Sequence, residues 1–225
     1  YGLSVVYGMM QSGGIRKALI LDGETRSKVY SPKDRRSAFL FGDGGVAALV
    51  ERDEKFGKSY FSLNSDGSRA DLIMIKGGHP SSEETLREKV VDEYGNIRSD
   101  EQGYMQGGDV FNFVIREIPR DIKKTLEYVG DTADSFDYIV FHQANNFINA
   151  YIAKKMKLDT DKIPSTIAKY GNTSSVSVPL TIVSELKDRL YGNKKLLLSA
   201  FGVGMTWATG IVPFVDCKIS DIVEV

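Results

Sequence analysis

Residues 137–145, which read DYIVFHQAN, carry the pattern that decides the fold of this chain. The apolar run 137–141 predicts a short strand that is covered on both faces, as in a parallel or mixed sheet. His142 follows at the end of that strand. In α/β proteins the strand fixes the position of such a residue and the next loop exposes it, so functional sites are commonly built there.

The chain on either side of this strand alternates between helix and strand patterns. Apolar residues at three- and four-residue steps predict helices over residues 1–11, 109–129, 147–156 and 179–190, with a kink at Pro119. Short apolar runs predict strands at 16–22, 196–201 and 205–215, and two more within 37–50 around a turn at 42–45. Residues 77–102 are polar and predict a long surface excursion. This alternation predicts an α/β class in which helices cover a mixed sheet, with a seam between two subdomains near Lys55.

Composition excludes several classes of protein. The chain has 225 residues, 42% hydrophobic, with 29 basic and 30 acidic side chains scattered along it, so it has no basic stripe for nucleic acid. No apolar run approaches the roughly 18–20 residues that span a bilayer. A lone cysteine and two histidines exclude an internal disulfide and leave little for a metal site. We expect a soluble, cytoplasmic protein with no metal.

His142 has two interpretations. In the structural one, its imidazole caps the next helix or is hydrogen-bonded at the end of the strand. In the catalytic one, a neutral imidazole donates to a carbonyl oxygen as it becomes negative, or acts as a base that takes a proton. One residue does not decide between them.

Asn172 lies in a second polar segment, Gly171–Ser174. A turn of this composition is commonly structural. The Asn172 amide is also able to donate to the same oxygen as His142, and two donors aimed at one developing oxyanion are a known catalytic device. Cys217 lies beyond the last predicted strand with no feature that lowers its pKa, and we interpret it as incidental.

Six motifs together resemble the C-terminal part of the β-ketoacyl-acyl-carrier-protein synthase III family, in the thiolase superfamily. They extend over nearly the whole chain in the order of the family, at residues 41–45 (FGDGG), 64–67 (NSDG), 105–111 (MQGGDVF), 142–145 (HQAN), 171–174 (GNTS) and 201–204 (FGVG) followed by Thr206 and Trp207. Each motif is modest alone, whereas the ordered set is specific.

The resemblance implies a thiolase-like layered fold of two similar halves. Residues 1–55 would be the tail of the N-terminal half, and residues 56–225 the whole C-terminal half. Family members use a Cys-His-Asn triad, whose cysteine begins the helix that continues into Tyr1. We therefore expect the nucleophile a few residues before Tyr1. We also expect these residues alone to be inactive and to self-associate through uncovered apolar surface.

The activity that the resemblance implies is a decarboxylative Claisen condensation of acyl-coenzyme A with malonyl-acyl carrier protein, in fatty acid or related polyketide biosynthesis. His142 and Asn172 would hold the malonyl thioester carbonyl, so that loss of carbon dioxide leaves a stabilised enolate. The backbone N–H of Val203 would form part of the oxyanion hole. Coenzyme A enters as a thioester substrate, and no cofactor is implied.

The resemblance also implies positions that bind substrate, which are Arg35, Gly107, Phe111 and Asn145. Arg35 matches a position at the nucleotide end of coenzyme A, Phe111 and Gly107 match the pantetheine tunnel, and Asn145 lies beside the tunnel. Lys154 and Lys155 keep a basic surface for docking the carrier protein. Phe147 and Asn112 depart from the family, which has basic residues there.

Two alternatives stay open. A relative with this fold could transfer an acyl group to oxygen or nitrogen without decarboxylation, and a non-catalytic partner subunit would lack the cysteine altogether. The full-length protein is expected to be a homodimer, with no nucleic-acid or membrane partner.

Overall fold

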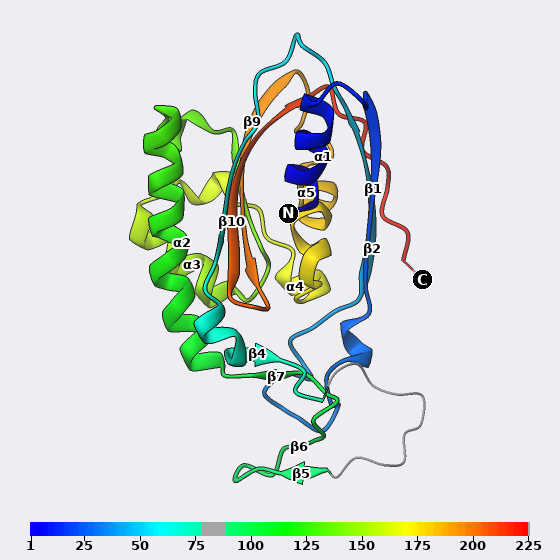
Figure 1. Ribbon diagram of the computed structural model, residues 1–225, viewed down its shortest axis with the longest axis vertical. Coiled ribbons are helices and arrows are strands. Elements are labelled where there is room, and N and C mark those ends of the chain that lie inside the picture. Colours follow the sequence, from blue (N-terminus) through cyan, green and yellow to red (C-terminus); the bar gives the residue numbers. More distant parts are fainter. Residues whose placement is uncertain (78–88, 225) are drawn as a thin grey trace.

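The computed structural model describes residues 1–77 and 89–224 and has a layered arrangement (Figure 1). Helices α2 (Gly107–Val129) and α3 (Asn146–Met156) lie on one side of the main sheet. On the other side lie α1 (Gly2–Gln11), α4 (Ile167–Tyr170) and α5 (Ser177–Leu186). The hairpin of β1 (Lys17–Glu24) and β2 (Gly44–Glu51) forms a further layer beyond these helices. The predicted α/β class with a mixed sheet is therefore confirmed.

The main sheet has the strand order β3-β10-β9-β8. Its members are β3 (Tyr60–Ser65), β8 (Tyr138–Phe141), β9 (Asn193–Gly202) and β10 (Thr206–Val215). β8 pairs with β9 in parallel, with Phe141 opposite Ser199, and the other pairs are antiparallel. The strands predicted at 137–141, 196–201 and 205–215 are all present in this sheet.

Each face of the sheet packs against its own group of helices. Along β8, Ile139 and Phe141 join the core formed with α2 and α3, whereas Val140 joins the core formed with α5. This division follows from the two-residue period of a strand, which turns successive side chains to opposite faces. Both faces are covered, so β8 consists of apolar and aromatic residues throughout.

Helix α2 continues through Pro119 without interruption, and the kink expected there stays a prediction. Proline has no N–H to donate to the carbonyl four residues earlier, which is that of Ile115. The Nζ of Lys155, on α3, donates to the Ile115 carbonyl oxygen at 2.7 Å. A side chain from the neighbouring helix thus replaces the donor that Pro119 lacks.

A buried carboxylate ties α2 to the sheet. Asp121 is 5% exposed, and its Oδ1 accepts from Ser62 Oγ at 2.6 Å and from Asn64 Nδ2 at 2.8 Å. Its Oδ2 accepts from Thr209 Oγ1 at 2.6 Å. The donors belong to β3 and β10, so one carboxylate fixes α2 across two strands of the sheet.

The region ahead of β2 differs from the prediction of two strands within residues 37–50. Only β2 forms, and it pairs with β1. Residues 37–40 form successive turns, in which the Ala38 N–H donates to the Asp34 carbonyl at 2.8 Å. Phe41 makes a single parallel bridge to Asn172, because Gly171, at φ 65°, and the turn after Asn172 leave the partner chain extended for one residue only.

The remaining elements are short. They are η1 (Arg26–Lys28), η2 (Gly67–Leu72), β4 (Ile73–Met74), β5 (Val90–Val91), β6 (Ile97–Arg98), β7 (Tyr104–Met105), η3 (Ala133–Ser135), η4 (Thr160–Lys162) and η5 (Ser174–Val176). Strands β4 and β7 pair, as do β5 and β6, at one end of the molecule (Figure 1). Part of the excursion predicted at 77–102 lies outside the described residues. Helix α5 ends at Leu186 rather than at Leu190, because the chain turns there and the Arg189 N–H donates to the Leu186 carbonyl at 2.9 Å.

Candidate active site

His142 is positioned by the sheet. It directly follows β8, and its N–H donates to the Ser199 carbonyl on β9 at 2.8 Å, which extends the parallel pairing by one residue. Its carbonyl accepts from Asn149 Nδ2, on α3, at 3.1 Å. Phe201 meets the imidazole edge-on, with the ring centroids 5.1 Å apart. The backbone and the ring of His142 are therefore both held.

The environment of His142 keeps its imidazole neutral. The residue is 8% exposed, and burial lowers the pKa of the imidazole from 6.5 to about 4, against the opposing effect of a hydrogen bond to the backbone of Ser174. Nδ1 lies 2.7 Å from Ser177 Oγ. Because Ser177 faces Nδ1, Nε2 is the ring nitrogen that a ligand would meet, and the Ser174 carbonyl, whose hydrogen bond raises the pKa, competes for an imidazole N–H.

Asn172 lies in the loop between α4 and η5. Its N–H donates to the Leu40 carbonyl at 2.8 Å, and its carbonyl accepts from the Gly42 N–H at 3.0 Å. Its side-chain Oδ1 accepts from the Ser174 N–H at 2.9 Å. Within the described residues Nδ2 has no hydrogen-bond partner, so the amide presents a free N–H donor.

Ser174 brings the two predicted catalytic side chains together. Its backbone bonds to the His142 imidazole, and its N–H bonds to the Asn172 side chain. Ser174 has φ 55°, in the left-handed region that residues other than glycine seldom adopt. The loops after β8 and after α4 thus place a neutral imidazole and a carboxamide against one residue, an arrangement that is able to offer two neutral donors to one oxygen.

Val203 lies in the turn between β9 and β10. It is 54% exposed, and its carbonyl accepts from Thr206 Oγ1 at 3.2 Å. Its own N–H makes no backbone hydrogen bond within the described part of the chain and is available to a ligand. Phe201, two residues earlier, packs against His142, so this turn lies at the same end of the sheet as His142.

The predicted tunnel residues gather where α2 and α3 begin. Phe111 stacks on Phe147, with the ring centroids 5.3 Å apart, and meets Tyr151 edge-on at 5.8 Å. Asn145 Oδ1 caps α3 by accepting from the Ile148 N–H at 2.8 Å, so part of this side chain has a structural role. Gly107 lines a shallow pocket with Arg36, Tyr104, Met105, Gln106, Gly108, Asp109 and Asn112.

Arg35 is not among the residues that line this pocket. It is exposed, and its N–H donates to Asn96 Oδ1 at 3.0 Å. The neighbouring Arg36 lines the pocket instead, and its guanidinium lies 4.5 Å from the centroid of the Tyr94 ring. Two adjacent arginines give sequence reasoning no signal for which of them faces the pocket.

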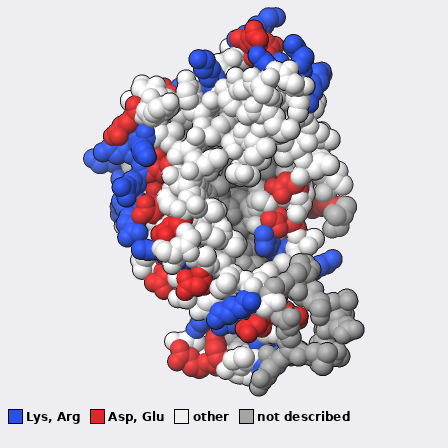
Figure 2. Space-filling view, viewed as in Figure 1, with Lys and Arg blue, Asp and Glu red and all other residues white. Residues whose placement is uncertain are grey.

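The two lysines predicted to dock a carrier protein differ in their surroundings. Both are exposed on α3, but Lys155 is engaged with the Ile115 carbonyl described above. Further Lys and Arg side chains gather with acidic ones along the edge formed by α2, whereas the middle of this face is hollowed and largely uncharged (Figure 2).

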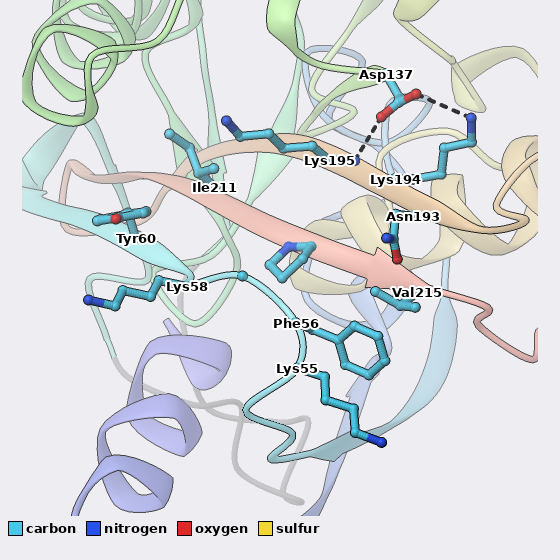
Figure 3. Close-up of a pocket in the computed structure, with 12 residues that line it drawn as sticks. Lys55, Phe56, Lys58, Tyr60, Asp137, Asn193, Lys194, Lys195, Ile211 and Val215 are labelled. Carbon is cyan, nitrogen blue, oxygen red and sulfur yellow. Dashed lines mark hydrogen bonds and ion pairs between the residues drawn. The ribbon is translucent and has the colours of Figure 1, made fainter.

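A second pocket lies away from these residues. It is lined by the loop between β2 and β3, the start of β9 and the end of β10 (Figure 3). Asp137 lies at its side, where its Oδ1 is 3.2 Å from Lys194 Nζ and its Oδ2 accepts from the Lys195 N–H at 2.8 Å. Asp137 precedes β8 and His142 follows it, so this pocket lies at the opposite end of the strand from the candidate site.

The part of the chain that the structure describes gives little support to a metal site, a membrane-spanning helix or a reactive thiol. In residues 1–77 and 89–224 no cluster of acidic, histidine or cysteine side chains could hold a metal ion, and no helix there is both long and apolar enough to cross a membrane. Cys217 is exposed, yet desolvation of its thiol raises the pKa above the usual value. It therefore lacks the lowered pKa of a reactive nucleophile.

Sequence reasoning missed Ser174 and Ser177, which hold the candidate catalytic groups. Both lie in the Ser-rich segment that follows Asn172, where hydroxyls are expected to cap a helix. Their contacts with His142 join residues more than 30 positions apart, so local sequence carries no signal for them.

The fold and the site define an α/β protein of the thiolase-like class, in which a histidine after a central strand and an asparagine from a separate loop contact the same serine. Residues 1–67 match the family described as 3-oxoacyl-[acyl-carrier-protein (ACP)] synthase III, and residues 126–214 match the family described as its C-terminal part. The chain belongs to the 3-oxoacyl-[acyl-carrier-protein] synthase III family, which confirms the resemblance seen in the six motifs.

Individual relatives agree with this assignment. The chain is 35% identical over 217 residues to the beta-ketoacyl-[acyl-carrier-protein] synthase III of Streptococcus gordonii, a match that covers 94% of this chain and 64% of the relative. It is 36% identical over 216 residues to the Streptococcus pneumoniae Hungary19A-6 protein of the same name. A 3-oxoacyl-(acyl-carrier protein) synthase from Burkholderia xenovorans superposes with a TM-score of 0.87 at 34% identity, over 97% of this chain and 62% of that one. The chain thus spans a little under two thirds of the length of these relatives.

Proposed function

We propose that the protein carrying this chain is a decarboxylating condensing enzyme of fatty acid biosynthesis. It joins an acyl group from acyl-coenzyme A to malonyl-acyl carrier protein and releases carbon dioxide. The observation that carries this proposal is the meeting of the neutral His142 imidazole and the Asn172 amide at Ser174. Family membership supports the choice of reaction, and the names of the relatives support the choice of carrier substrate.

In the proposed reaction, His142 Nε2–H and Asn172 Nδ2–H donate to the carbonyl oxygen of the malonyl thioester. The bond to the carboxylate breaks, carbon dioxide leaves, and its electron pair stays on the α-carbon as an enolate. Negative charge grows on the carbonyl oxygen during this step, so both hydrogen bonds strengthen in the transition state. Neutral donors suffice because they are already oriented in a site from which water is largely excluded.

The enolate carbon then attacks the acyl group, which a cysteine thiolate carries as a thioester. The new carbon–carbon bond forms a tetrahedral oxyanion that accepts from the Val203 N–H, and its collapse expels the thiolate. The family resemblance assigns the nucleophile to a cysteine before Tyr1. The raised pKa of Cys217 makes that thiol unsuited to the task.

The remaining assignments follow from the family resemblance. We assign the pantetheine arm of the substrate to the entrance formed by Phe111, Gly107 and Asn145, and the nucleotide end of coenzyme A to Arg35. Carrier-protein docking is assigned to Lys154 and Lys155, of which Lys154 is the cleaner probe because Lys155 also supports α2. We further propose a cytoplasmic homodimer that needs no cofactor.

The test is carbon dioxide release from malonyl-acyl carrier protein by the full-length protein, in which this chain follows its N-terminal segment. Removing one donor of an oxyanion site costs about 10²–10³-fold in rate. His142→Ala and Asn172→Ala should each slow release by about that factor. Asn193→Ala, an exposed position beside the second pocket, serves as the matched control and should retain the wild-type rate. Carbon dioxide release by either site variant at the wild-type rate would refute the proposal.

The same assay separates the other two functions. An enzyme that moves the acyl group to oxygen or nitrogen would transfer acyl from acyl-coenzyme A without releasing carbon dioxide. A non-catalytic subunit would do neither. Either result would replace the condensing reaction with the corresponding alternative.

A further inference from the structure

We infer that Ser177 is a positioning residue, whose hydroxyl donates to Nδ1 of His142 and thereby fixes the imidazole in the tautomer that carries its proton on Nε2. This inference deepens the proposed function, because an Nε2–H group is the donor that the malonyl thioester oxygen requires. Ser177 itself does not touch the substrate.

The hydrogen-bond network around Ser177 assigns the direction of this contact. Ser177 is the first residue of α5 and is fully buried, and its Oγ lies 2.7 Å from His142 Nδ1. The Gln143 N–H donates to the same Oγ at 3.3 Å. A hydroxyl has one hydrogen and two lone pairs, and the Gln143 N–H takes one lone pair. Nδ1 is the one acceptor that the described residues offer to the hydroxyl hydrogen.

The reverse arrangement is unfavourable. If Nδ1 carried the proton, two N–H groups would point at Ser177 Oγ, and its buried hydroxyl hydrogen would lack an acceptor. A buried donor without a partner is destabilising. The hydrogen bond that an imidazole N–H gives to the Ser174 backbone does not by itself select a tautomer, and the contacts of Ser177 favour a bare Nδ1 and a protonated Nε2.

The surroundings of the ring make the tautomer matter. Phe201 packs edge-on against the imidazole, with an interplanar angle of 86°, and the His142 backbone is held by Ser199 and Asn149. Because the ring is held in this way, the position of the proton decides whether Nε2 presents an N–H group or a lone pair to a ligand. With the proton on Nδ1, the ring would show an Nε2 lone pair to the substrate oxygen, and the two lone pairs would repel.

Nuclear magnetic resonance of the full-length protein labelled with ¹⁵N-histidine tests the assignment directly. The His142 signals are identified by their loss in His142→Gln. At neutral pH we expect an unprotonated Nδ1 and a protonated Nε2 in the wild type. Ser177→Ala should shift the population toward Nδ1–H, and Ser177→Thr, which keeps the hydroxyl, should restore the wild-type pattern. A wild-type spectrum with the proton on Nδ1 would overturn the inference whether or not any variant folds.

Kinetics give a second readout. Loss of one buried neutral hydrogen bond changes an equilibrium by about three- to tenfold, so Ser177→Ala should lower kcat for carbon dioxide release by about that factor with little change in KM. Thr181→Val is the matched control, since it removes another fully buried hydroxyl one turn along α5 that bonds to Thr166 and to the Ser177 carbonyl rather than to the imidazole.

The outcomes of the two readouts are distinct. An equal loss of kcat in Thr181→Val, without a tautomer shift in Ser177→Ala, would show a merely structural role and overturn the inference. If the expected tautomers are seen but no form of the protein releases carbon dioxide, the proposed reaction fails and the assignment of the Ser177 hydrogen bond stands.

Discussion

Gly42 lies where the segment ahead of β2 meets Asn172, and an added methyl group there would separate the two. The Gly42 N–H donates to the Asn172 carbonyl at 3.0 Å. A Cβ on Gly42 would lie 2.1 Å from the carbonyl oxygen of Tyr170. The φ of Gly42 lies outside the left-handed region, so alanine is compatible with the backbone and its effect would come from this contact alone.

The size of the effect follows from the distance. Cβ atoms essentially never approach closer than 3.0 Å, so the backbones must separate by about 0.9 Å. Overpacking of this kind costs about 1–3 kcal/mol. At about 2–4 °C per kcal/mol for a chain of this size, the Tm should fall by about 2–12 °C. A displacement near 1 Å at a catalytic group costs on the order of 10²-fold in rate, so carbon dioxide release should fall by that factor.

Gly44→Ala supplies the matched control, because its Cβ would meet Val176 Cγ1 at 3.4 Å, an ordinary contact. Gly44→Ala should leave the Tm close to that of wild type and keep the rate of carbon dioxide release within about twofold. Thermal unfolding and the carbon dioxide assay, both on the full-length protein, compare the two variants. If Gly42→Ala retains the wild-type Tm and rate, the bridge between Phe41 and Asn172 does not position the amide, and our account of this loop is wrong.

Three further predictions concern titration, the buried network and the thiol. The unfolded state binds a proton on His142 between pH 6.5 and about 4 that the folded state does not, so stability falls as pH falls through this range. The unfolding free energy of wild type relative to His142→Gln should drop by about 3 kcal/mol from pH 7 to pH 4 in urea titrations, and a constant difference would contradict the neutral imidazole. Asp121→Ala leaves the buried Thr209 hydroxyl and the half-buried Ser62 and Asn64 donors without their acceptor, and should cost about 3–5 kcal/mol of unfolding free energy. The exposed Glu127→Ala should cost at most about 0.5 kcal/mol, and equal losses would argue against the network. Cys217→Ser should leave carbon dioxide release unchanged, and a marked loss would give the thiol a role that its raised pKa does not support.

The sequence predicted the central strands well for a physical reason. Residues 138–141 and 196–201 lie in strands covered on both faces, and a short, continuous apolar run is typical of such strands. A short apolar run does not always form a strand, and the same reasoning failed at residues 37–41, which form turns. Whether such a run becomes a strand depends on a partner of matching length, and Asn172 offers only a single bridge.

Only part of the candidate site could be predicted from the sequence. His142 was found because it follows an apolar run, and Asn172 because its amide is able to donate to the same oxygen; the structure places both against Ser174. The division of the chain at residue 55 and the binding roles of Arg35, Asn145 and Val203 stay predictions. The role of Ser177 could not be predicted from the sequence, because its contact with His142 forms only after the two loops have packed.

The Lys155 contact with Ile115 makes two distant positions depend on one another. The ammonium is needed there only because Pro119 withholds a donor, so a chain with alanine at 119 would satisfy the carbonyl within the helix and release the lysine. Substitutions at 119 and 155 should therefore be non-additive in stability, although 36 residues separate them. Among homologues, we expect the two positions to covary, with the lysine free to drift wherever the proline is absent.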